Sequence, residues 1–416
     1  MQKITKINIP ASKSITQRAF ICATISNGRC LVKNPLKSED TVLLASGLKE
    51  LGSKISWQKH CVTIEGNSGN FQDKGKKTIF MGNNGTGFRF LTTFSNFYKN
   101  EVILTGDKRM LERPVGSLAE SLNNAGFKVE YLLKYGFPPV KIIPVSNELK
   151  NNLKINTEQS SQFLSSVLLC APLFSDDLTV NSEGSSVSFP YVKLTIDVMN
   201  SFGVNVEERN NGFFVSKGSF YKATEYIVEN DFSSASYFAA AAVIKNKRVK
   251  LENLFYEKSK QGDKRFLDIL SKMGGSVAFS EDSVIVSGGK LRGITVDMNN
   301  MPDMVPTLSV LALFAETETI IKNIAHLRFK ETDRIETVVK NIVKVGGKAV
   351  AGKDYIKITP MGKNSFNNID IDPENDHRIA MSFALLKLVN NNINILNKKC
   401  VNKSFPDFWK EFEKLL

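Results

Sequence analysis

The chain has 416 residues, of which 42% are hydrophobic and 23% charged, and this balance is typical of a globular protein with buried cores. It excludes an intrinsically disordered or collagen-like chain, and the length predicts two or three domains. Lysine and arginine number 55 against 42 acidic residues, a net charge of +13. This charge suits nucleic acid, an anionic membrane or small anions. Because the basic residues are spread along the chain, we favour small anionic ligands.

The cysteines and the N-terminal segment bear on the cellular compartment. The five cysteines are odd in number and form no CxxC pair, which argues against a disulfide framework and a zinc site. The first ten residues resemble a strand rather than a signal peptide, and no apolar run approaches the roughly 18 residues of a membrane span. A reducing compartment, the cytoplasm, is therefore expected.

In chain order, the first predicted element is a strand at residues 1–9, where Ile4, Ile7 and Ile9 are spaced for one face. Six helices follow that are apolar on nearly every face. They begin near Ser14, Gly85, Ser160, Ser233, Asp303 and Asp376. These starts recur every 70 to 75 residues, which predicts six copies of one unit. A helix apolar all round must be buried all round, so each copy should contribute one central helix.

A second series of helices is amphipathic, and each of the first five ends in a glycine that leads into a strand. These glycines are Gly52, Gly126, Gly203, Gly274 and Gly346. A glycine in this place takes the left-handed conformation that caps a helix. The sixth copy has its helix at residues 406–416 but no following strand, which the strand at residues 1–9 could supply. Copies 1 to 3 would then form one domain, and copies 4 to 6 with the N-terminus the other.

Polar residues gather at the starts of the six central helices. The motifs are Ser12-Lys13-Ser14 with Arg18, Asn83-Asn84-Gly85-Thr86 with Arg89, Ser160-Ser161-Gln162, Asp231-Phe232-Ser233-Ser234, Pro302-Asp303 and Asn375-Asp376-His377-Arg378. Helix N-termini present unpaired N–H groups and partial positive charge, which makes them anion sites. Each motif alone is an ordinary helix cap. Six in register indicate a shared site for anionic ligands.

Three loop motifs are further candidates. Arg109 and Arg113, in the segment 106–114, could together hold a carboxylate or phosphate, and the alternative is a surface ion-pair cluster around Glu112. The segment 330–334, Lys-Glu-Thr-Asp-Arg, offers the same choice between a ligand site and pairing on a helix surface. The segment 403–407 has the pattern of a capped helix start.

Taken together, the motifs resemble the 5-enolpyruvylshikimate-3-phosphate synthase family, which belongs to the enolpyruvyl transferases. The matching segments run in family order from Pro10 to Trp409 and include PASKSITQRA, GNNGTGFRFL, LTGDKRMLERPVGSL, SSQFLSSVLLCAPL, SFPYVKLTIDVMNSFGV, DFSSASYFAAAA, MPDMVPTLSVLALFAE, FKETDRIE, NDHRIAM and KSFPDFW. Their order over nearly the whole chain makes the resemblance specific.

The resemblance implies an α/β (α+β) fold of two similar domains, each with three βαβαββ-type repeats around buried parallel helices. One domain would comprise residues 1–11 and 229–416 and the other residues 12–228, with hinges near 11 and 229. The implied reaction transfers the carboxyvinyl group of phosphoenolpyruvate to the 5-hydroxyl of 3-phosphoshikimate and releases phosphate through a tetrahedral intermediate. The resemblance implies no metal and no organic cofactor, and we expect a monomer that binds neither nucleic acid nor membrane.

The resemblance also implies roles for individual residues. Asp303 would accept the proton of the attacking hydroxyl, and Glu331 or Lys13 would deliver a proton to the vinyl carbon. The 3-phosphoshikimate contacts would be Lys13, Ser14, Arg18, Ser160, Ser161, Gln162, Ser188, Tyr191, Asp303, His326 and Lys330. The phosphoenolpyruvate contacts would be Lys13, Gly85, Arg109, Gln162, Arg334, Arg378 and Lys403. Both substrates are phosphorylated carboxylates, so their joint binding requires such a set of cations and helix ends.

Several residues depart from the family pattern. Asn84 stands where Ala or Ser is usual, Gly87 where Ala is common, and Phe90 where proline is frequent. These departures bear on phosphoenolpyruvate affinity and on sensitivity to the inhibitor glyphosate. His326 stands where an asparagine is often a ring contact, and His377 is either a ligand contact or a structural histidine.

Three other functions were weighed. The sister carboxyvinyltransferase that uses a UDP-sugar would carry a cysteine in the loop that here reads GDKRMLERP, and this loop has none. A nucleic-acid-binding protein would expose aromatic residues for stacking, whereas most phenylalanines here lie in apolar helices. An inactive relative would have lost Lys13, Asp303 or Glu331, and all three are present.

Overall fold

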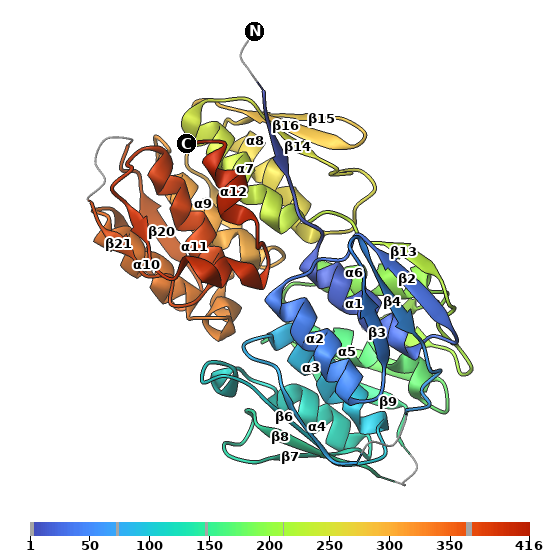
Figure 1. The fold of residues 1–416 in the computed structure, drawn as a ribbon. Coiled ribbons are helices and arrows are strands. Elements are labelled where there is room, and N and C mark those ends of the chain that lie inside the picture. The colour runs from blue at the N-terminus through green and yellow to red at the C-terminus, as the bar shows by residue number, and fades with distance from the viewer. Residues whose placement is uncertain (1–3, 72–74, 146–148, 211, 363–367) are drawn as a thin grey trace. The chain divides into compact units, whose positions relative to one another are not determined.

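The computed structural model describes residues 4–71, 75–145, 149–210, 212–362 and 368–416. The chain forms two compact units (Figure 1). Unit 1 contains Met1–Pro10 and Glu229–Leu416, and unit 2 contains Ala11–Val228. Ala11, which we expected in the other domain, packs in the core of unit 2.

The described residues of unit 2 form three four-stranded sheets and six α-helices. The sheets have the strand orders β13-β2-β4-β3, β5-β6-β8-β7 and β11-β12-β10-β9. The strands are β2 (Arg29–Lys33), β3 (Lys54–Trp57), β4 (Cys61–Glu65), β5 (Lys77–Phe80), β6 (Val102–Thr105), β7 (Lys128–Tyr131), β8 (Val140–Ile143), β9 (Asn152–Asn156), β10 (Leu178–Glu183), β11 (Glu207–Arg209), β12 (Gly212–Val215) and β13 (Glu225–Ile227). The helices are α1 (Lys13–Ile25), α2 (Glu39–Glu50), α3 (Gly85–Phe94), α4 (Gly116–Asn124), α5 (Gln162–Leu169) and α6 (Pro190–Ser201).

Unit 1 has the same plan, with two four-stranded sheets and one two-stranded sheet among the described residues. The sheet orders are β1-β14-β16-β15, β17-β18-β20-β19 and β21-β22. The strands are β1 (Thr5–Asn8), β14 (Val249–Glu252), β15 (Ser276–Phe279), β16 (Ser283–Ser287), β17 (Thr295–Asp297), β18 (Thr319–Lys322), β19 (Lys348–Ala351), β20 (Ile356–Thr359), β21 (Asp370–Ile371) and β22 (Asn394–Ile395). The helices are α7 (Phe232–Lys245), α8 (Phe266–Lys272), α9 (Val305–Ala312), α10 (Arg334–Lys344), α11 (His377–Ala384) and α12 (Phe408–Glu413).

In the second, third and fifth copies the chain order within the sheet gives the βαβαββ repeat that was expected. In the second copy, β5 leads through α3 to the parallel strand β6, and α4 then leads to the antiparallel pair β7 and β8. The third and fifth copies have the same order of strands and helices. The predicted fold class is therefore confirmed.

One prediction about the repeats is wrong. The N-terminal strand does not complete the sixth copy: β1 pairs in parallel with β14 in the fourth copy's sheet, as Figure 1 shows. Residues 1–3 of the predicted strand lie outside the described part of the chain. The strand directly before α7 in sequence, β13, pairs instead with β2 in the first copy. Each unit thus fills its first parallel position with a strand from elsewhere in the chain, which periodicity alone does not reveal.

The central helices are buried as predicted. In α1 every residue except Ser14 is buried, and in α7 every residue except Lys245. Hydroxyl groups join neighbouring central helices at equivalent places in the repeats: Thr93 with Ser166 at 2.8 Å, and Thr307 with Ser382 at 3.1 Å. These bonds satisfy polar side chains that lie inside the core.

The five helix-ending glycines all have positive φ, between 89° and 105°, as the sequence predicted. A residue with a Cβ rarely adopts this conformation, so glycine is required where each outer helix turns into its strand.

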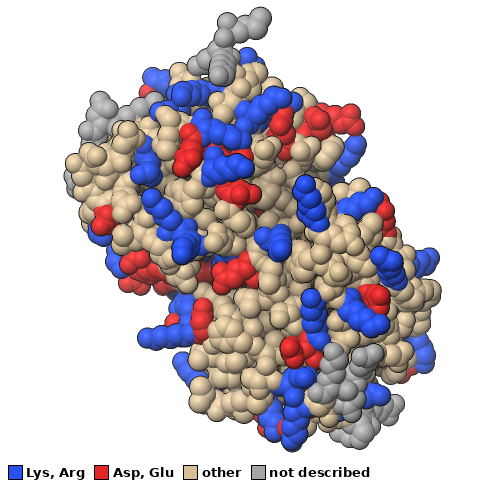
Figure 2. Space-filling view, viewed as in Figure 1, with Lys and Arg blue, Asp and Glu red and all other residues tan. Residues whose placement is uncertain are grey.

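Charged side chains are mixed on the surface. Figure 2 shows lysine and arginine scattered over the visible face with acidic residues between them, which matches their spread in the sequence. The five cysteines are free thiols. No helix within the described ranges is long and apolar enough to span a bilayer.

Candidate active site

In unit 2 the first group of predicted residues lies at the start of α1. Lys13 is buried, and its Nζ lies 2.9 Å from Oδ2 of Asp40, which α2 contributes. Asp40 was not among the predicted site residues, because its place in the first turn of α2 is ordinary for an acidic residue. The ion pair fixes the position of the lysine side chain.

Arg18 is also buried, with 1% of its surface exposed, and its guanidinium carbon lies 5.3 Å from the ring centre of Phe90. Its hydrogen bonds within the described ranges all go to neutral oxygens. Its guanidinium donates to Thr195 Oγ1 at 2.8 Å and to the carbonyls of Ser14 and Tyr191 at 2.9 and 3.2 Å. Burial lowers the pKa of Arg18 to about 10, so it is still protonated at neutral pH. No carboxylate in the described part of the chain pairs with it. A buried guanidinium in this state favours binding of a carboxylate or phosphate.

The start of α3 carries two of the departures from the family pattern, and the structure connects them. Asn84 caps the helix by accepting from Gly87 N at 2.9 Å, and its amide donates to Gln17 Oε1 and the Asp40 carbonyl. A Cβ on Gly87 would lie 2.4 Å from Asn84 Nδ2. The glycine at 87 therefore accommodates the larger side chain at 84.

Position 85 requires glycine for a separate steric reason. A Cβ there would lie 2.5 Å from a guanidinium nitrogen of Arg113. Arg113 is itself buried and donates to both the carbonyl and the side-chain oxygen of Asn83, at 2.9 and 2.8 Å. The two arginines of this loop have different surroundings, since Arg109 is partly exposed and pairs with Glu112 at 2.9 Å. The surface ion pair considered from the sequence is present.

Gln162, the first residue of α5, lies beside the start of α3. Its Oε1 accepts from Arg89 Nη1 at 2.6 Å, and its Nε2 donates to Thr86 Oγ1 at 3.0 Å. The starts of α1, α3 and α5 are thus joined through side chains.

Three predicted serines lie in unit 2 with Tyr191. Ser161 and Ser188 are buried, and Ser160 Oγ accepts from Gln162 N at 3.2 Å. Ser188 has a φ of 54°, an unusual value for a residue other than glycine. Its buried Oγ has no hydrogen-bond partner among the described residues. Strained backbone and an unsatisfied hydroxyl together are typical of a ligand site.

In unit 1 the central feature is a carboxylate between two arginines. The Asp303 oxygens lie 2.7 Å from Arg334 Nη1 and 2.7 Å from Arg378 Nη2. Burial alone raises the pKa of Asp303, but the charges of Arg378, Arg334 and Lys330 outweigh it and hold the pKa well below its usual range. Asp303 is therefore ionised at neutral pH.

Arg334 binds two further carboxylates, both at 2.7 Å: Glu331 Oε2, and Oδ2 of Asp376, which caps α11. Burial lowers the pKa of Arg334, but Asp376, Glu331 and Asp303 raise it above its ordinary value. The pairing of Glu331 with Arg334 that we considered from the sequence exists, but it is buried rather than on a helix surface. Asp376 was predicted only as part of the motif at the start of the sixth central helix.

The other predicted residues of unit 1 surround this cluster. His326 is buried, and burial followed by the charge of Lys330 lowers its pKa to about 3, so it is neutral. Lys330 is partly exposed at the end of the short helix Ala325–Phe329. Lys403 is buried at the end of the short helix Lys398–Lys403, which packs against α11. The segment 403–407 precedes α12 as expected, but Asp407 makes no side-chain capping bond.

His377 is fully buried at the first position of α11, with Nδ1 3.8 Å from Asp376 Oδ1. This location favours the structural role over ligand contact.

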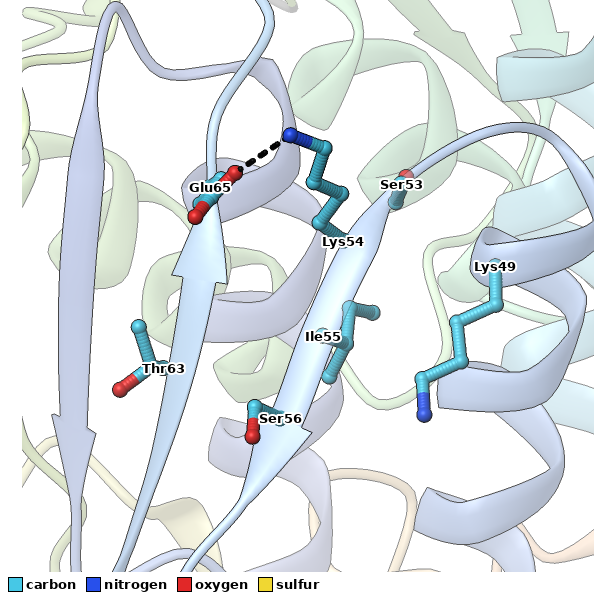
Figure 3. Close-up of a pocket in the computed structure, with 7 residues that line it drawn as sticks. All are labelled: Lys49, Ser53, Lys54, Ile55, Ser56, Thr63 and Glu65. Carbon is cyan, nitrogen blue, oxygen red and sulfur yellow. Dashed lines mark ion pairs between the residues drawn. The ribbon is translucent and has the colours of Figure 1, made fainter.

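Two cavities on unit 2 contain none of the predicted residues. One has a volume of about 370 Å³, and in Figure 3 it lies beside the Lys54–Glu65 ion pair of 3.1 Å. The other, of about 560 Å³, includes Ser186 and Phe189, which flank Ser188 in sequence.

Within the described ranges, no group of three or more His, Cys, Asp or Glu side chains could hold a metal ion. The cluster in unit 2 consists mainly of cations, hydroxyls and helix starts, and the cluster in unit 1 consists of arginines paired with carboxylates. Their chemistry is suited to anionic ligands and to proton transfer by Asp303 or Glu331.

Comparison with known proteins agrees with this chemistry. The family model described as EPSP synthase (3-phosphoshikimate 1-carboxyvinyltransferase) matches residues 3–412. The chain is 41% identical over 432 residues to 3-phosphoshikimate 1-carboxyvinyltransferase of Actinobacillus pleuropneumoniae serotype 5b, covering 100% of this chain and 99% of the relative. It is 42% identical over 412 residues to the protein of that name from Buchnera aphidicola subsp. Cinara cedri, covering 98% and 94%. A solved EPSP synthase from Acinetobacter baumannii superposes with a TM-score of 0.79 at 25% identity, covering 100% of this chain and 96% of that one. The chain therefore belongs to the EPSP synthase (3-phosphoshikimate 1-carboxyvinyltransferase) family.

Proposed function

We propose that this chain catalyses the reaction that names its family: it transfers the carboxyvinyl group of phosphoenolpyruvate to the 5-hydroxyl of 3-phosphoshikimate. This is a step of the shikimate pathway toward aromatic amino acids. The hydroxyl oxygen bonds to C2 of phosphoenolpyruvate while C3 gains a proton, which gives a tetrahedral intermediate. Loss of a proton from C3 and cleavage of the C2–O bond to phosphate then release the product and inorganic phosphate.

The observation that carries this proposal is the charge state of Arg18. It is a buried cation whose hydrogen bonds within the described ranges all go to neutral oxygens, and the carboxylate of 3-phosphoshikimate would supply the missing negative charge. Ser14 and Tyr191, whose carbonyls bond Arg18, would contact the same ligand. The hydroxyls of Ser160, Ser161 and Ser188 would bind its phosphate, and the unpartnered Oγ of Ser188 supports that role.

Cationic residues would hold phosphoenolpyruvate. Arg334 and Arg378 would bind its carboxylate, and Lys13, Arg109, Lys403 and the backbone at Gly85 its phosphate, with Gln162 between the two ligands. His326 and Lys330 would lie near the hydroxyls of 3-phosphoshikimate. Because these residues neutralise charge that develops as phosphate leaves, electrostatic stabilisation would supply most of the acceleration.

Asp303 would accept the hydroxyl proton, and Glu331 or Lys13 would give a proton to C3. The ionised state of Asp303 supports its role as the acceptor. As long as Arg334 and Arg378 both hold it, however, its low pKa makes it a weak base. Transfer of the two guanidiniums to the substrate carboxylate would restore its basicity, so substrate binding and proton acceptance are linked in this proposal.

The decisive experiment is phosphate release by the purified chain with both substrates together and with each omitted. Release that requires both is expected, and Lys13→Met should reduce both the rate and the affinity for phosphoenolpyruvate. Release without 3-phosphoshikimate would indicate a phosphatase, and no release with both would refute the proposal. Three further properties stay predictions: the monomeric state, the cytoplasmic location and movement about hinges near residues 11 and 229. Light scattering tests the monomeric state.

A further inference from the structure

The side chain of Arg89 is buried and held in place near the start of α5. Arg89 lies in α3 with 3% of its surface exposed, and its guanidinium stands 5.3 Å from the ring centre of Phe163. One of its terminal nitrogens donates to Gln162 Oε1 at 2.6 Å and the other to the Pro114 carbonyl at 3.0 Å. Packing and two hydrogen bonds thus hold the guanidinium in one orientation.

A guanidinium carries only hydrogen-bond donors, so the amide of Gln162 must turn its oxygen toward Arg89. Its NH₂ group then faces away, toward Thr86 Oγ1 at 3.0 Å. One N–H is used in that bond and the second is left for another acceptor. Thr86 accepts the bond from Gln162, so its own hydroxyl proton is also left for an acceptor.

We propose that Arg89 is a positioning residue. By orienting the Gln162 amide, and through it the Thr86 hydroxyl, it makes both side chains present hydrogen-bond donors to an anionic substrate. This inference rests on the proposed function, which takes Gln162 as a ligand contact. Without Arg89 the amide could rotate by half a turn and present its oxygen, and an oxygen facing a phosphate or carboxylate is repelled. Arg89 therefore acts through another side chain and need not touch the substrate.

A double-mutant cycle tests this role. The variants are Arg89→Met, Gln162→Met and both together, and the measurement is the dissociation constant of 3-phosphoshikimate by calorimetry. Each single change should weaken binding roughly tenfold to a hundredfold, as expected for loss of a hydrogen bond to a charged group. In the Gln162→Met background the Arg89 change should have almost no further effect, because the orientation of an absent amide cannot matter.

The same two helices provide a matched control. Thr93 and Ser166 lie one turn further along α3 and α5 and bond each other at 2.8 Å. Thr93→Val removes a bond between these helices without touching the Gln162 amide, so it should lower the unfolding temperature and leave the dissociation constant unchanged. Arg89→Lys keeps a donor for Gln162 Oε1 and should restore most of the binding.

The outcomes separate the two proposals. Three results would show that Arg89 serves only packing. The first is a double variant whose loss of affinity is the product of the two single losses. The others are a loss of affinity in Arg89→Lys, or in Thr93→Val, as large as that in Arg89→Met. Failure of Arg89→Met to fold leaves the lysine variant to decide, since weak binding by that folded variant also refutes the role. If the unaltered chain does not bind 3-phosphoshikimate, the proposed function fails and this inference fails with it.

Discussion

Asp303 and Arg334 form a direct ion pair, with Oδ1 2.7 Å from Nη1, in which the arginine is 1% exposed and the carboxylate is shared with a second arginine. The pair brings together the short 3-10 helix Pro302–Met304, directly before α9, and the first residue of α10. The residue proposed to accept a proton is therefore held by the residues proposed to bind the substrate carboxylate.

Replacing Asp303 by asparagine should separate catalysis from binding. The variant keeps the size of the side chain but cannot accept the hydroxyl proton, so turnover should fall by roughly 10² to 10⁴. Affinity for phosphoenolpyruvate in the presence of 3-phosphoshikimate should be unchanged or tighter, because both guanidiniums lose a competing carboxylate. Steady-state kinetics and calorimetry measure the two effects, with the exposed Asp297→Asn as control. Unimpaired turnover removes Asp303 from the mechanism.

Asp263 should make stability depend on pH in mildly acidic solution. It is buried, and Ser233 donates a hydrogen bond to it. Burial raises the pKa of Asp263 from 3.8 to about 6, and the negative charges of Asp303 and Asp231 add to this rise. The positive charge of Arg378 opposes the rise only in part. The native state therefore holds a proton that the unfolded chain has lost. The stability that this proton contributes is present below about pH 4 and is lost as the pH rises to about 6.

Asp263→Asn removes this titration. Relative to the unaltered chain, the variant should gain up to about 3 kcal/mol in free energy of unfolding between pH 4 and pH 7, about 1.4 kcal/mol per unit of pKa shift. Urea unfolding at several pH values measures the difference. Parallel curves for the two proteins would mean that Asp263 is not protonated in the native state.

His326 should remain neutral throughout the range in which an ordinary histidine titrates. Its pKa of about 3 results from burial and from the positive charges of Lys330 and Arg334, against the opposing charge of Asp303. His326→Asn should therefore leave the shape of the pH dependence of 3-phosphoshikimate binding between pH 5.5 and 8 unchanged. An inflection near pH 6.5 that disappears in the variant would contradict this.

The same lowered pKa has a consequence for stability. The unfolded chain gains a proton at His326 below about pH 6.5 and the native state does not, so stability present above this pH is lost as the pH falls. His326→Asn should reduce that loss, which denaturant unfolding at pH 5 and pH 7.5 can measure.

Asn84 and Gly87 should behave as a coupled pair. Gly87→Ala places a methyl group 2.4 Å from Asn84 Nδ2 and 2.7 Å from Met81 Cε, and overpacking of this kind costs about 1–3 kcal/mol. Asn84→Ala loses three hydrogen bonds, each contributing about 0.5–1.5 kcal/mol. With alanine at both positions the methyl group gains room, so the double variant should be less destabilised than the sum of the two. Additive losses would show that the two positions are independent.

The sequence predicted the helices well because their signals are local. Apolar spacing located the six buried helices, and glycine located the ends of five outer ones, since burial and backbone conformation leave direct marks on residue type. The partners of β1 and β13 left no such mark, because a strand carries little information about which parallel neighbour it joins.

The candidate site was predictable to a similar degree. Motifs at the helix starts drew attention to Lys13, Gln162 and Arg378, but their roles there remain proposals. The sequence did not reveal that Asp40 pairs with Lys13 or that Arg89 donates to Gln162, because those contacts join residues far apart in the chain. The burial of Arg334 was equally hidden, since its spacing from Glu331 is that of an ordinary surface pair.

The pairing of β1 with β14 determines how the protein can be divided for experiments. Unit 2 is one continuous stretch, Ala11–Val228, and includes β13, so it can be expressed as a single fragment with its sheets complete. A fragment that starts at residue 229 would lack β1 and expose the edge of β14, an open strand edge that invites aggregation. A soluble version of unit 1 therefore calls for a fusion that places the first ten residues, through a linker, in reach of that edge.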